Sequence, residues 1–130
     1  MFDFNKRWKQ RLSDLYGKRP YKSQADFIKE AEALGLDADL AIWVHDYFID
    51  YCPNLDQFGV YLEDRVIVDY EVDEEDLEFA IMRQLRKFGI PKPKRKETEN
   101  FLKQHEVSSA HQENVTVHYI IQFLQFCRDR

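Results

Sequence analysis

Residues 73–89 carry all the signals of one amphipathic helix. Asp73 is a good N-cap residue, and the acids that follow it suit the positive end of a helix dipole. Gly89 has the backbone freedom that a helix end requires. The side chains that recur at helical spacing and form the predicted core stripe are Leu77, Ala80, Ile81, Leu85 and Phe88. The helix is therefore predicted to run to Phe88, with basic residues in its last turns.

Five further segments show helical spacing or helix boundaries. They predict helices over 4–16, 24–34 and 38–51, a short helix near 98–105, and a last helix capped by Thr116 or Asn114. Their predicted core positions are Phe4, Trp8, Leu12, Leu15, Phe27, Ala31, Leu34, Leu40, Val44, Tyr47, Phe48, Tyr51, Val117, Ile120, Ile121, Leu124 and Cys127. A chain of 130 residues fits one domain, 1–130. The predicted fold class is mainly α, a helical bundle.

Residues 53–72 are the part of the chain whose structure is least clear from the pattern. Val66, Val68, Tyr70 and Val72 alternate with charged residues, which is typical of a strand. A single strand cannot pair its backbone groups, and no other segment offers a convincing partner. We therefore predict an ordered loop with extended character. The alternative is a small α+β fold with a strand near 65–72.

The charges are unevenly spread along the chain. Residues 1–22 carry +5, residues 37–80 carry −13 and residues 81–104 carry +6, within a net charge of −5. Two interpretations fit this layout. The basic ends could fold over the acidic middle and neutralise it, or the acidic middle could be a docking face for a basic partner.

The sequence contains no catalytic, metal or cofactor motif. A calcium loop that began at Asp69 would need Gly in place of Glu74 and Glu in place of Ala80. The four histidines have no zinc-finger spacing to cysteine. The basic run 92–96 could touch phosphates, but the acidic balance argues against nucleic acid as the main partner. We therefore expect no cofactor, no metal and no enzymatic activity.

The cysteines and the N-terminus indicate a compartment. Cys52 and Cys127 lie far apart in the sequence, which is typical of reduced thiols in a reducing environment. Residues 1–7 do not look like a signal peptide, and no apolar run approaches the roughly 20 residues needed to span a bilayer. We therefore expect a cytoplasmic protein without a membrane segment.

The predicted helix 73–88 has an irregularity on its outer side. At helical spacing Phe79 and Met82 fall opposite the core stripe, among charged residues. Large apolar side chains among charges indicate a contact surface. The predicted partner site therefore consists of Asp73, Glu74, Glu75, Asp76, Glu78, Phe79 and Met82, with a basic protein as partner. The alternative is that the N-terminal helices cover Phe79 and Met82.

Residues 64–88 resemble the second-helix region of an acyl carrier protein. That family has an acidic Asp-Leu-Gly stretch, then Asp-Ser-Leu-Asp, then an amphipathic helix that ends near a Phe. The matching stretch here is Asp69-Tyr70-Glu71, Asp73-Glu74-Glu75-Asp76 and then Leu77 to Phe88. Residues 116–124 are similar to the fourth carrier helix, which typically begins with Thr-Val. The resemblance implies a carrier-like bundle over 37–130, with 1–36 as a two-helix N-terminal extension.

The carrier family's serine for phosphopantetheine falls at Glu74, which has no hydroxyl to esterify. The prosthetic group and acyl carriage are therefore not expected to transfer. A closer match is a bacterial family of unknown function with a carrier-like fold, domain of unknown function 1493. Its members have an Asp-Gly-Asp-Asp type stretch, to which Asp73-Glu74-Glu75-Asp76 is similar. This resemblance covers about residues 37–126 and implies a fold without an assigned activity.

Three function classes are compatible with these observations. The leading hypothesis is a non-enzymatic protein–protein interaction module with an acidic docking helix. The alternative is an immunity or inhibitor protein whose acidic surface neutralises a basic toxin or nuclease, since such proteins are also small and acidic. The third is an enzyme of a type that the motifs do not reveal.

Overall fold

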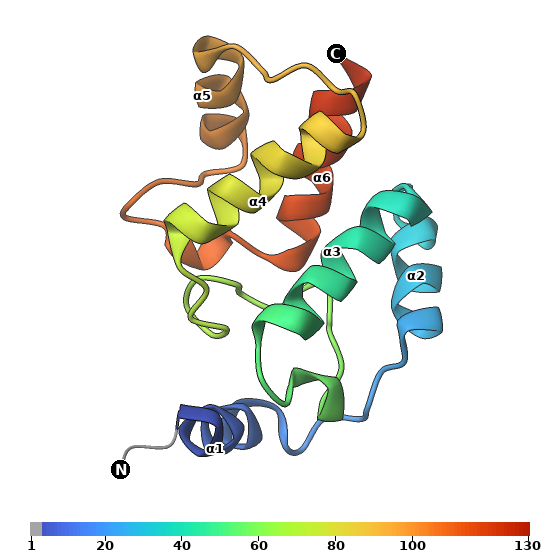
Figure 1. The fold of residues 1–130 in the computed structure, drawn as a ribbon, viewed down its shortest axis with the longest axis vertical. Helices are drawn as coiled ribbons and strands as arrows, with labels where there is room; N and C mark the ends of the chain where they lie inside the picture. Colours follow the sequence, from blue (N-terminus) through green and yellow to red (C-terminus); the bar gives the residue numbers. More distant parts are fainter. Residues whose placement is uncertain (1–3) are drawn as a thin grey trace.

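The computed structural model describes residues 4–130, and side chains from Lys6 onward. It contains α1 (Phe4–Tyr16), α2 (Gln24–Ala33), α3 (Ala38–Tyr51), α4 (Glu74–Lys87), α5 (Arg95–Gln104) and α6 (Val117–Asp129). Two short 3-10 helices, η1 (Leu55–Gln57) and η2 (Gln112–Asn114), lie in the connections. The chain is mainly helical, as predicted. In Figure 1, α3, α4 and α6 occupy the middle, with α1 and α5 at opposite ends.

The helix starts follow the predicted capping residues. Ser23, Asp37 and Thr116 each accept a hydrogen bond from the backbone N–H three residues later. Thr116, not Asn114, therefore caps the last helix. The helix α5 begins at Arg95, earlier than the predicted 98, because the carboxylate of Glu97 accepts a hydrogen bond from the Lys94 N–H at 2.9 Å.

The core is formed by apolar side chains from every α-helix and from the loop before α4. Helix α3 packs against α2 and α6, and α4 packs against α6. Leu12 of α1 and Phe27 of α2 are completely buried in the same cluster as Phe48 of α3 and Leu124 of α6. The N-terminal helices thus contribute to the core that the later helices form. The predicted core position Phe4 lies outside the described side chains.

Three predicted core residues are exposed, and all three lie at helix ends. Leu15, Leu34 and Phe88 are 42%, 58% and 45% exposed. After α2 and after α4, a glycine with positive φ reverses the direction of the chain: Gly35 follows Leu34, and Gly89 follows Phe88. The residue after that glycine then packs back: Leu36 donates its N–H to Ala31 at 3.0 Å and is buried. Ile90 does the same with Leu85 at 2.8 Å, so it replaces Phe88 against the core.

Residues 53–72 form an ordered loop, as predicted, and the α+β alternative is wrong, since no strand occurs between residues 4 and 130. The segment just before α6 partly satisfies the loop backbone. Val66 N–H donates to Val115 at 3.0 Å, and the bridge between Arg65 and Thr116 is isolated. Val66 and Tyr70 are completely buried, so the alternation reflects burial within a loop.

Part of the charge polarity is neutralised inside the molecule. Arg19, just after α1, donates two N–H groups to the buried carboxylate of Asp64. Its guanidinium also lies 3.6 Å from the ring centroid of Tyr16 and 3.9 Å from that of Tyr61. Arg11 forms an ion pair with Glu71 at 3.3 Å. The basic N-terminal segment therefore pairs with Asp64 and Glu71 of the loop, and with none of the acids of α4 among the described residues.

A tight contact between two loops makes one glycine irreplaceable. Gly59 has φ +82°, and a Cβ atom there would lie 2.5 Å from the carbonyl oxygen of Lys22. Gly35 has a similar φ of +78°, with nothing within 4 Å of its Cβ position. We expect Gly35→Ala to cost about 1 kcal/mol and Gly59→Ala about 2–4 kcal/mol in the free energy of unfolding. Urea denaturation of both variants measures this, and equal losses would contradict it.

Candidate protein-binding face of helix α4

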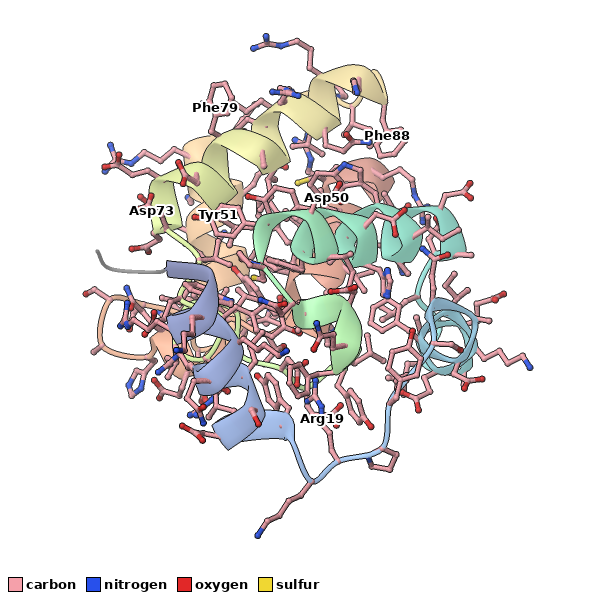
Figure 2. All side chains as sticks on the ribbon, turned by 60° about the horizontal axis from the view of Figure 1, so that its bottom comes forward. Arg19, Asp50, Tyr51, Asp73, Phe79 and Phe88 are labelled. Carbon is pink, nitrogen blue, oxygen red and sulfur yellow. The ribbon has the colours of Figure 1, made fainter. Side chains whose placement is uncertain are left out.

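Two side chains fix the start of α4. The Asp73 carboxylate accepts hydrogen bonds from the N–H groups of Glu75 at 2.9 Å and Asp76 at 3.1 Å. The hydroxyl of Tyr51, at the end of α3, accepts from the Asp73 N–H at 3.2 Å and donates to Asp76 at 3.0 Å. Figure 2 shows Tyr51 and Asp73 close together at this corner. The first turn of α4 is therefore held to α3.

The acids of the first turns lie on the surface, where the sequence predicted them. Asp73, Glu74, Glu75, Asp76 and Glu78 are all exposed. Glu74 accepts a weak hydrogen bond from Gln112 at 3.3 Å. In the described part of the chain, none of these five carboxylates forms an ion pair. The structure thus brings them together as a negative surface without a basic counterpart of its own.

Phe79 is the most exposed large apolar side chain among the described residues, at 68%. In Figure 2 its ring stands on the outer side of the α4 ribbon, away from the body of the molecule. It borders a shallow groove between α3 and α4, where Trp43 and Tyr47 contribute their rings. These two rings stack with centroids 5.5 Å apart. Burial, with Tyr51 and Asp76 nearby, raises the pKa of Tyr47 to about 12.

Met82 does not share this face, so its predicted place on the outer side is wrong. It is partly buried and packs against the core. With Leu102 of α5 and Phe123 of α6 it lines an apolar cavity of about 230 Å³ between these helices. The alternative that the N-terminal helices cover both residues is also wrong, because Phe79 is uncovered and α5 and α6 lie next to Met82.

The aromatic residues of the groove were missed as part of the site. Tyr47 and Tyr51 were predicted to point inward. Both pack against the core, as Trp43 does, but all three are only half-buried. The three residues recur every four positions, the spacing of a row along one side of a helix. That row was the sequence signal from which an aromatic surface on α3 could have been predicted. Of this row, Trp43 and Tyr47 line the same groove as Phe79.

Other reactive groups in the described chain are buried or scattered. Burial raises the pKa of Cys52 to about 12 and that of Cys127 to about 11, so both are thiols at neutral pH. Burial and His105 lower the pKa of His118. Over residues 4–130 there is no group of three or more His, Cys, Asp or Glu side chains placed to hold a metal ion. No helix in this range has both the length and the apolar character needed to cross a membrane.

Comparison with protein-family models, with curated proteins and with solved structures finds no match to this chain. The geometry of the α4 face is therefore the basis for assigning a function.

Proposed function

We propose that this protein is a non-enzymatic protein–protein interaction module that binds a basic partner through the first half of α4. The exposure of the Phe79 ring on a helix whose first turns carry exposed acids is the observation that carries this proposal. A phenyl ring costs free energy when it is left in water, and a partner that covers it recovers that free energy. The proposed partner site consists of the five predicted acids and Phe79, together with Trp43 and Tyr47; Met82 is left out.

The charges define the chemistry of the partner. Glu75 and Glu78 form no ion pair with other described residues, so a basic surface can approach them without displacing a cation of this chain. Such charges accelerate encounter and select against acidic proteins, whereas the apolar contact supplies most of the binding free energy. We expect binding to weaken as salt is added, since the Debye length is about 8 Å at physiological ionic strength.

The proposal retains the expectation of a carrier-like scaffold without acyl carriage. Glu74 stands at the start of α4, where a carrier would have its serine, and it offers a carboxylate in place of a hydroxyl. On such a scaffold, a partner would recognise the charge and shape of α4 without any attached acyl group.

Replacing Phe79 by alanine tests the site. Phe79→Ala should weaken partner binding by about tenfold or more, because an anchoring ring typically contributes 1–2 kcal/mol or more. It should change the free energy of unfolding by less than about 0.5 kcal/mol, because the ring is exposed. The tagged chain is used to capture its partner from the native cell. The affinity of the purified pair is then measured by calorimetry at two salt concentrations.

Met82→Ala is the matched control, three residues along the same helix. It should lower the free energy of unfolding by about 1–2 kcal/mol, since Met82 packs against the core, and leave partner affinity unchanged. If Phe79→Ala bound the partner as tightly as the unmodified chain, the binding site would lie elsewhere. Capture of a basic toxin or nuclease whose activity is blocked would favour the inhibitor interpretation.

A further inference from the structure

The two halves of α4 carry opposite charges that nothing in the described chain neutralises. The first half has four acids, and the second half is basic through Arg83, Arg86 and Lys87. Favourable pairs along a helix need opposite charges three or four residues apart, and no acid of α4 has a base at that spacing. Among residues 4–130, these three cations form no ion pair. Each half therefore presents exposed charges with which a second molecule can pair.

The stripe of α4 that lines the groove is self-complementary. It includes Ala80, which was predicted as a core residue and is half-buried at the edge of the groove. Its members line the groove beside Trp43 and Tyr47: Asp76, Phe79, Ala80, Arg83, Gln84 and Lys87. An antiparallel second α4 that places its Lys87 opposite Asp76 also places its Gln84 opposite Phe79. The same register places Arg83 of the second copy opposite Ala80. Since the register is symmetric, each of these contacts occurs twice, as a two-fold interface requires.

We infer that a second copy of this chain docks on α4 in this antiparallel register, with α4 against α4 about a two-fold axis. The Phe79 ring of each copy enters the other copy's groove, which Trp43 and Tyr47 line. The small side chain of Ala80 lets the helices approach closely near the axis. Antiparallel helix dipoles add to the attraction between acid and base.

The size of this contact indicates how strong it is. A helix of 14 residues is about 21 Å long, so the helix pair and the groove form an interface at the small end of the range for specific complexes. We therefore expect a dimer that forms in the micromolar range and dissociates as salt is added. The dimer goes beyond the proposed function and competes with it, because both the second copy and the basic partner cover Phe79.

Sedimentation of the whole chain with exchanged charges tests the register. Asp76→Lys alone and Lys87→Asp alone each place like charges opposite one another at both ends of the interface. Each should raise the dimer dissociation constant at least about tenfold. In an equimolar mixture of the two variants, every Asp76–Lys87 contact has opposite charges again, so a mixed dimer should form. Leu34→Ala, which removes an exposed side chain just after α2, should leave dimerisation unchanged.

Asp76→Lys removes the hydrogen bond that the Tyr51 hydroxyl donates to Asp76, so this variant could fail to fold. A second variant therefore tests the same interface without changing Asp76. Ala80→Lys keeps a good helix former and both charged ends, and it puts a lysine opposite Arg83 of the second copy, so it should be monomeric. Because Ala80 is half-buried, circular dichroism first checks that this variant is folded. An unmodified chain that stays monomeric up to about 1 mM would overturn the inference. So would folded single variants that still dimerise, or a mixture that stays monomeric. Lys87→Asp retains the acids and Phe79, so partner binding by this variant separates the proposed function from the dimer.

Discussion

Replacing Asp64 by alanine should lower the free energy of unfolding by about 3–5 kcal/mol, because it leaves a mostly buried cation unpaired. The Asp64 carboxylate accepts from two N–H groups of Arg19, from the Tyr61 N–H at 3.0 Å and from the Tyr70 hydroxyl. Burial, reinforced by the charge of Asp64, raises the pKa of Tyr70 well above its ordinary value, so this hydroxyl stays a donor. Urea denaturation followed by circular dichroism measures the loss.

The double variant Arg19→Met with Asp64→Ala is the control. Removing both charges leaves no unpaired cation, so the double variant should lose less stability than the sum of the two single variants. The difference measures the coupling between the two side chains. A loss below about 1 kcal/mol in Asp64→Ala would show that water replaces the carboxylate, and that this cluster does not hold the N-terminal segment in place.

Replacing Leu12 by alanine should cost about 3–5 kcal/mol, since the side chain is completely buried and its removal leaves a cavity. Leu12 lies in α1 but belongs to the core cluster that α3 and α6 share. If residues 1–130 form one domain, this loss should move the unfolding of the whole chain. Trp8 of α1 and Trp43 of α3 report on the two regions separately, in Trp43→Phe and Trp8→Phe backgrounds respectively.

Leu15→Ala is the matched control for Leu12→Ala. Leu15 lies in the same helix and is 42% exposed, so its removal should cost less than about 1 kcal/mol. Two separate transitions, with only the Trp8 signal shifted by Leu12→Ala, would show that α1 unfolds on its own and that the prediction of one domain is wrong.

Local signals predicted the helices well because capping acts between neighbours in sequence. Asp37 and Asp73 bond to N–H groups two or three residues away, so the pattern of residues is sufficient to find the helix starts. The helix ends were predicted less well. Leu34 and Phe88 follow the helical spacing, but the glycine after each turns the chain so that the next residue takes the buried place.

The candidate site shows where local reasoning stops. Phe79 and Met82 both fall opposite the core stripe, but α5 and α6 lie against one and not the other. The position of α5 depends on contacts between residues far apart in sequence, such as Arg130 with Glu97 at 3.1 Å. The burial of the Asp64 carboxylate could not be predicted for the same reason. Its partner Arg19 lies 45 residues earlier in the chain, and Tyr61 and Tyr70 belong to its own irregular loop.

The hydroxyl of Tyr51 has a consequence for the kinetics of recognition. By bonding to both Asp73 and Asp76, it fixes the end of α3 against the start of α4 before any partner arrives. The rings on α3 and the acids on α4 therefore keep their relative positions in the free protein. A preorganised surface of this kind loses little conformational entropy when it is covered, so we expect the proposed partner to bind without a prior rearrangement of this chain.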